Sequence, residues 1–201
     1  MLLTAKDRRL EASWKKMGVL RPLQESSLPL FEQALLVTCF DARYFLRWYR
    51  QLVDIASQRQ KQESPQLFPF IMGGTPLVMD PSSPIHSKFD HRGATDCSVG
   101  LAKANGCLHA TVIGHYPCKA GEDCGIGLLE NVALTVAGGR RLIRDGVETA
   151  TLFDLKEQKD APCNPWHLDA SAFQEWCLSH QPEILNQYPG IRRGFSTPAL
   201  Q

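Results

Sequence analysis

Two short clusters of residues that can bind a metal ion lie far apart in the chain. They are Cys39-Phe-Asp41-Ala-Arg43 and His115-Tyr-Pro-Cys118. Each cluster directly follows an apolar, strand-like run, over 34–38 and 108–114. If these runs are neighbouring parallel strands, their carboxyl ends meet at one edge of a sheet. Cys39, His115 and Cys118 then form a three-ligand zinc site, and its open fourth position favours an enzyme over a structural zinc module.

Asp41 and Arg43 stand two and four positions beyond the first ligand. Two thiolates offset the charge of zinc, so water bound to that zinc needs help from its neighbours to ionise near neutral pH. Asp41 can accept a proton and hold the orientation of the water. Arg43 can pin that carboxylate through a bidentate pair and keep it charged. We therefore predict Asp41 and Arg43 as the catalytic residues.

The same residues allow other interpretations. A single cysteine often packs as a small buried apolar residue, and Asp-x-Arg at a helix start is often a cap with an exposed ion pair. Cys118 and Cys124 could also join Cys97 and Cys107 in a structural zinc site. The loop between Cys118 and Cys124 is similar to a phosphate-binding cysteine loop, but it lacks the required arginine at its end.

Hydrophobic patterning predicts the elements that position the two clusters. The apolar run 34–38 is typical of a strand buried on both faces, and 44–60 has the spacing of an amphipathic helix. Pro69 cannot donate a ladder hydrogen bond, so a strand over 66–72 should lie at a sheet edge. Further expected elements are helices over 97–104, 128–144 and 172–179, and strands over 108–114 and 148–155.

Alternating strands and helices predict an α/β fold with a mainly parallel β-sheet flanked by helices. Ligands of such folds bind beyond the carboxyl ends of the strands, where the strand order reverses. A chain of 201 residues fits one domain, here 1–201. Within it we expect an N-terminal helical arm and linker over 1–29, and a loosely held tail over 190–201. The arm should pack on the body of the chain or on a second subunit.

Composition restricts the partners and the compartment. Lys and Arg total 22 against 21 Asp and Glu, so nucleic acid is not expected as a partner. No run approaches the roughly 18 apolar residues that span a bilayer. The N-terminal segment lacks the pattern of a signal or transit peptide. Seven cysteines, an odd number, indicate reduced thiols and a cytoplasmic location.

The motifs Cys-x-Asp-x-Arg and His-x-x-Cys, in these strand contexts, resemble the β-class carbonic anhydrases over about 34–155. The resemblance implies that family's fold and one zinc ion per chain, held by Cys39, His115 and Cys118. It implies reversible hydration of carbon dioxide to bicarbonate through a zinc-bound hydroxide, which Asp41 orients with Arg43 as its partner. It also implies a homodimer or homotetramer that acts on a small-molecule substrate.

Several positions around the pocket depart from the family pattern. The segment 71–75, Ile-Met-Gly-Gly-Thr, stands where the family has Arg-Asn-x-Gly/Ala, and Lys119 replaces a glycine after the last ligand. A glutamine from a partner subunit lines the family's site, and Gln62 or Gln66 is the candidate here. Two alternatives therefore stay open. One is a carbon dioxide-like sulfur substrate, carbonyl sulfide or carbon disulfide; the other is a non-catalytic zinc-binding or regulatory module.

Overall fold

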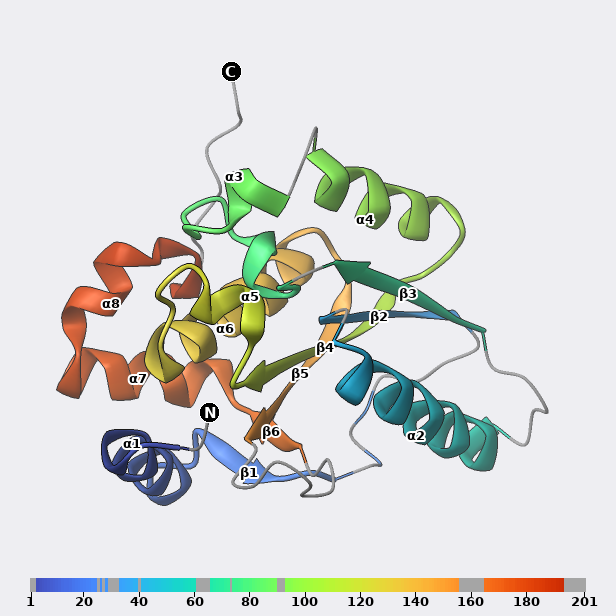
Figure 1. Ribbon diagram of the computed structural model, residues 1–201. Coiled ribbons are helices and arrows are strands. Elements are labelled where there is room, and N and C mark those ends of the chain that lie inside the picture. The colour runs from blue at the N-terminus through green and yellow to red at the C-terminus, as the bar shows by residue number, and fades with distance from the viewer. Residues whose placement is uncertain are drawn as a thin grey trace.

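The fold is described from a computed structural model of the chain (Figure 1). The structure describes residues 3–24, 26, 28, 33–39, 41–60, 66–72, 74–89, 93–155 and 165–193. For residues 33, 42–45, 59–60, 66–68, 72 and 89 it describes the backbone but not the side chain. Within these residues, no helix is both long and apolar enough to cross a membrane.

One sheet organises the molecule, and its six strands follow the order β1-β6-β5-β4-β2-β3. The strands are β1 (Leu20–Pro22), β2 (Gln33–Cys39), β3 (Gln66–Met72), β4 (His109–Tyr116), β5 (Glu148–Leu155) and β6 (Trp166–Leu168). From β5 to β3 the strands run parallel. Strand β6 pairs antiparallel with both β5 and β1. The predicted α/β class with a mainly parallel sheet is confirmed.

Helices cover both faces of this sheet (Figure 1). Helix α2 (Ala42–Gln60) covers one face, where Trp48 packs in one apolar cluster with Leu36 and Ile113. Helices α4 (Ala94–Ala104) and α6 (Leu128–Arg144) cover the other face, packing on the apolar side chains of β2 and β4. The remaining helices are α1 (Ala5–Lys16), η2 (Leu77–Met79), α3 (His86–Phe89), α5 (Lys119–Glu122), α7 (Ala170–His180), α8 (Pro182–Gln187) and η4 (Pro189–Ile191).

The strand order reverses beside β2. From β2 the chain first adds β3 on one side and then β4 on the other, so β2 lies between these two strands. The carboxyl ends of β2 and β4 therefore lie together at the place where α/β folds bind ligands. The parallel pairing of β2 with β4 and the edge position of β3, which contains Pro69, are both as predicted from the sequence.

Several segments differ from expectation, and one of them is helix α4, which begins at Ala94 rather than 97. Leu20–Pro22, placed in a linker, is strand β1 and pairs with β6. Helix α7 begins at Ala170 rather than 172, because the Asp169 carboxylate accepts hydrogen bonds from Ser171 and Ala172 N–H. Strand β4 extends to Tyr116. The expected tail from 190 starts with the buried pair Gly190 and Ile191 in η4, which packs on α6. Residues 194–201 lie outside the described residues.

The N-terminal helix packs on the body of its own chain. Trp14 of α1 is fully buried, with edge-on ring contacts to Phe173 at 6.0 Å and Trp176 at 5.6 Å between centroids. Trp176 Nε1–H also donates to Ser13 Oγ at 2.9 Å.

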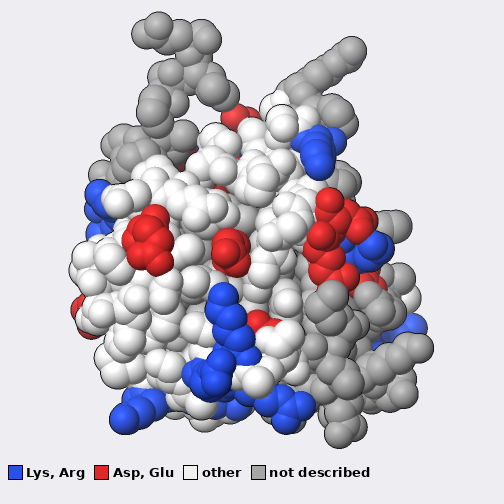
Figure 2. Space-filling model, turned by 60° about the vertical axis from the view of Figure 1, so that its left-hand side comes forward, with Lys and Arg blue, Asp and Glu red and all other residues white. Residues whose placement is uncertain are grey.

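The charged side chains on one face of the molecule are shown in Figure 2. Lys and Arg gather at the lower rim of the face in view, where α1 and β1 lie, with Asp and Glu above them. Both signs of charge therefore share this face of the molecule.

Candidate metal centre

The structure brings the three predicted ligands together. The ligand atoms of Cys39, His115 and Cys118 all lie within 4.8 Å of one another. All three residues are buried, at 5%, 3% and 2% exposure. Among the residues that the structure describes, this is the group of His, Cys, Asp or Glu side chains close enough to hold a metal ion. It lies at the carboxyl ends of β2 and β4, as their parallel pairing requires.

Cys39 is the last residue of β2, and its sulfur accepts a hydrogen bond from a backbone amide that follows β3. The Gly74 N–H donates to Cys39 Sγ at 3.3 Å. Contact with Cys118 lowers the pKa of Cys39, His115 and the Gly74 amide lower it further, and burial opposes them. Gly74 has φ +81°, and a Cβ there would lie 2.7 Å from Ile85 Cδ1. Glycine is therefore needed where the backbone approaches the sulfur.

Cys118 follows β4 and directly precedes the short helix α5. The backbone amides of Gly121 and Ala120, in the first turn of α5, favour a thiolate at Cys118. Contact with Cys39 and burial outweigh these amides and raise the pKa of Cys118. The contact between the two sulfurs therefore opposes ionisation of both thiols at once when no metal is bound. A divalent cation that binds here must displace the remaining proton.

His115 is oriented by its own chain. Its Nδ1 lies 3.0 Å from the Pro117 carbonyl oxygen. A carbonyl only accepts hydrogen bonds, so Nδ1 carries the proton and Nε2 presents the lone pair that a metal needs. The backbone of this ligand is also held, because Asn131 Nδ2 on α6 donates to the His115 carbonyl oxygen at 3.1 Å.

Close packing keeps β4 and α6 together next to this ligand. A Cβ on Gly114 would lie 2.2 Å from Thr135 Oγ1 and 2.8 Å from Phe153 Cδ2. Glycine at 114 thus lets helix α6 come close enough for Asn131 to reach the His115 carbonyl. The first turns of α6 form part of the support of the metal site.

This donor set fits zinc. Two sulfurs and one imidazole nitrogen are ligands that zinc accepts in tetrahedral sites, and three protein ligands leave one position for water or substrate. The Gly74 N–H donates to Cys39 Sγ, so the charge of a thiolate at Cys39 is stabilised even before a metal binds. Asp41 lies outside the group of mutually close ligand atoms.

The predicted catalytic pair is only partly described. Asp41 follows the end of β2 and is half-buried. Arg43 lies in the first turn of α2, and its side chain lies outside the described residues. Of the two glutamines considered as pocket residues, Gln62 and the side chain of Gln66 also lie outside them. The Asp41–Arg43 pair therefore stays a prediction.

The alternative four-cysteine zinc site does not form in the described part of the chain. Cys97 is exposed on α4, while Cys107 is buried in the core between α4 and the sheet. Cys124 is half-buried, and Lys88 Nζ donates to its sulfur at 3.4 Å. Cys118 instead groups with Cys39 and His115.

Two residues that support the site were not predicted from the sequence, and a third lies beside it. Gly74 and Asn131 act through the contacts described above. Asp154 is 1% exposed and is the register partner of His115 on β5, so both side chains leave the same face of the sheet. A signal existed for two of them, since Gly74 and Asp154 lie near the carboxyl ends of strands beside the ligand strands. Asn131 sits within an otherwise apolar helix pattern, which gave no indication of its partner.

Comparisons with known proteins give a limited result. No protein-family model matches the chain, and no curated protein matches it. Among solved structures, the chain is similar to a carbonic anhydrase from Streptococcus mutans, with 14% sequence identity and a TM-score of 0.32. The match covers 77% of this chain and 94% of that one. This likeness carries no assignment of activity, so any function has to be argued from the site itself.

Proposed function

We propose that the chain binds one zinc ion through Cys39, His115 and Cys118 and catalyses the reversible hydration of carbon dioxide to bicarbonate. The observation that carries the proposal is the convergence of three buried ligand atoms, all within 4.8 Å, at the switch point of a parallel sheet. The resemblance of the two ligand motifs to the β-class carbonic anhydrases supports the choice of reaction.

Zinc, when bound, supplies the Lewis acidity that makes water a nucleophile near neutral pH. The protein residues supply the rest. Asp41, two residues beyond the Cys39 ligand, accepts a hydrogen bond from the attacking oxygen and orients it, while Arg43 keeps that carboxylate ionised. Overall, carbon dioxide and water give bicarbonate and a proton, and buffer removes the proton from the site.

The test separates metal binding from turnover. We expect about one zinc per chain by elemental analysis, and carbon dioxide hydration in a stopped-flow assay that is lost with the metal. Asp41→Asn should keep the zinc and lose about 10²–10⁴-fold in rate, the usual contribution of a positioned acid or base. Full hydration activity in a zinc-free sample would refute the proposal. Parallel assays on carbonyl sulfide identify the preferred substrate.

We further propose a cytoplasmic homodimer or homotetramer. Support for the oligomer comes from large exposed apolar side chains on the helices, Leu46 on α2 at 50% and Leu101 on α4 at 67%. Light scattering coupled to size-exclusion chromatography measures the mass directly. Leu101→Lys should shift the mass toward that of one chain if α4 lies in the interface. A wild-type mass equal to that of one chain would contradict the proposal.

A further inference from the structure

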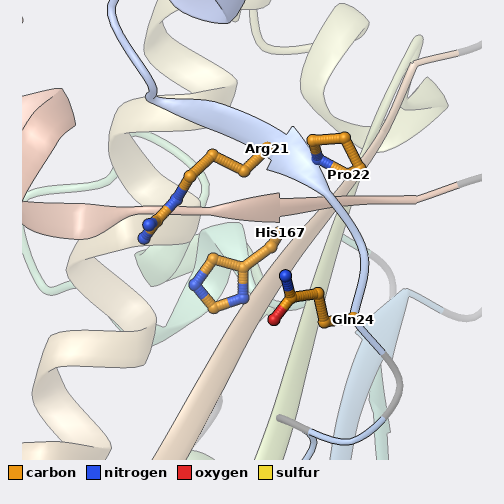
Figure 3. A pocket seen from close by; sticks show the side chains of 4 residues that line it. All are labelled: Arg21, Pro22, Gln24 and His167. Atoms are coloured by element: carbon orange, nitrogen blue, oxygen red, sulfur yellow. The ribbon is translucent and has the colours of Figure 1, made fainter.

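A cavity of about 190 Å³ lies at the antiparallel end of the sheet, away from the cysteine ligands. Among the described residues, Arg21, Pro22, Gln24 and His167 line it. Figure 3 shows the imidazole of His167 between the guanidinium of Arg21 and the amide of Gln24. Arg21 and His167 are register partners on β1 and β6, so their side chains leave the same face of the sheet.

His167 borders this cavity and has unused hydrogen-bonding capacity. Its Nδ1 is buried and has no hydrogen-bond partner among the residues that the structure describes. In Figure 3 the Gln24 amide points toward this side of the ring. A buried polar atom without a partner costs free energy unless a ligand or water satisfies it. The ring thus borders the cavity with a polar atom that the described residues leave unsatisfied, and a guest reaches this atom once the Gln24 amide moves aside.

The electrostatics of the cavity favour an anion. Arg21 forms an ion pair with the Asp169 carboxylate, and its side chain stays 53% exposed. A guanidinium has five N–H donors, so donors remain after one pairs with Asp169. Burial lowers the pKa of His167, and the charge of Arg21 lowers it more than Asp169 raises it. The charge of Arg21 therefore acts on the imidazole more strongly than the nearby carboxylate does.

We propose that this cavity is a second ligand site, which binds a small carboxylate through Arg21, His167 and Gln24. Guanidinium groups match the planar geometry of a carboxylate, and the imidazole and amide can each donate one further N–H. The size of the cavity limits the ligand, because sites for drug-sized molecules have volumes of about 300–1,000 Å³. A carboxylate with few other heavy atoms fits, whereas a nucleotide does not. The proposal does not rest on the proposed function.

Acetate is the probe, and acetamide is its uncharged control of the same shape. We expect acetate to shift the His167 imidazole nitrogen and Gln24 amide resonances in NMR spectra with saturation in the millimolar range. Acetamide should shift them far less. Arg21→Gln should weaken acetate binding about tenfold or more, the usual effect of losing a charge-assisted hydrogen bond. Arg21 is half-exposed, so this variant should stay folded.

Asp169→Asn is the matched variant with the opposite expected sign. Asparagine caps helices as well as aspartate does, so α7 keeps its cap while the competing negative charge is lost. We expect acetate to bind several-fold more tightly to this variant. Equal shifts with acetamide and acetate, or binding unchanged in Arg21→Gln, would overturn the proposal. Repeating the titration on chelator-treated protein separates this site from the metal centre, because acetate should still move the His167 signals.

Discussion

The two ends of the sheet carry polar groups of different kinds. At the parallel end, Cys39, His115 and Cys118 are almost fully buried, and one backbone amide and one backbone carbonyl contact Cys39 and His115. At the antiparallel end, Arg21 and Asp169 form a partly exposed ion pair beside the half-buried His167. Parallel strands bring distant residues to one buried edge, whereas the short antiparallel pair places side chains on an open rim. The first arrangement suits a metal ion and the second a soluble ligand.

The two histidines make this difference specific. His115 has its Nδ1 fixed by the Pro117 carbonyl, so its other nitrogen is committed as an acceptor before any ligand arrives. His167 has a buried Nδ1 with no partner among the described residues. A metal ligand gains from a fixed tautomer, while a site for a hydrogen-bonding guest gains from a ring that can donate or accept.

The largest expected effect is the loss of zinc affinity in Cys118→Ala, compared with Cys177→Ala at another buried cysteine. Cys118→Ala removes a ligand, so zinc affinity should fall by more than the ~100-fold typical of losing an outer-shell partner. Cys177→Ala is the control, because burial raises the pKa of Cys177 to about 12 and keeps it a neutral thiol in the core. It should keep the zinc and lose only about 1 kcal/mol of stability. Competition with a chromogenic chelator measures both affinities, and similar zinc binding by the two variants would contradict the assignment.

A smaller effect on stability and zinc affinity is expected from substitutions at two glycines between α6 and the sheet. Gly114 lies on β4 and faces α6, and Gly139 lies on α6 and faces β5. Gly114→Ala would place a Cβ 2.2 Å from Thr135 Oγ1, and Gly139→Ala would place one 2.4 Å from Thr151 Oγ1. Overpacking of this kind costs about 1–3 kcal/mol, so both should lower the unfolding free energy. Only Gly114 adjoins a ligand, so only Gly114→Ala should also weaken zinc binding, by about tenfold. Equal zinc affinity in the two folded variants would show that the packing of α6 does not position His115.

The sequence predicted the parts of the fold that depend on local pattern. The expected bounds of α6 and β5 match the observed Leu128–Arg144 and Glu148–Leu155. The end of α4 at Asn105 and Gly106 is also as expected, with Gly106 at φ +81°. Each of the two helices ends just before a glycine with a left-handed conformation, Gly106 after α4 and Gly146 after α6. Such signals need no knowledge of distant partners.

Elements that depend on distant partners could not be predicted in this way. Leu20–Pro22 has too few residues for a strand pattern, and it is a strand because β6 pairs with it. The Gln174 side chain on α7 accepts a hydrogen bond from Arg140 on α6, a contact between residues 34 positions apart that no local pattern indicates. In the site, residue type and position after a strand predicted the three ligands. The amide of Gly74 was not predicted, because its role depends on backbone geometry rather than on a side chain.

The smallest expected effect concerns the pH dependence of stability at the antiparallel end. Burial and the charge of Arg21 hold the pKa of His167 below its ordinary value of 6.5. The unfolded chain therefore binds a proton that the folded chain does not, so His167 lowers stability as the pH falls through that value. His167→Gln should remove this contribution and flatten the decline of the unfolding free energy between pH 7 and pH 5, as measured by urea denaturation. Saturating acetate should flatten the wild-type decline in a similar way, because an anion beside the ring favours its protonated form in the folded state. Identical pH profiles for wild type and His167→Gln would show that burial and the charge of Arg21 do not lower the pKa of His167.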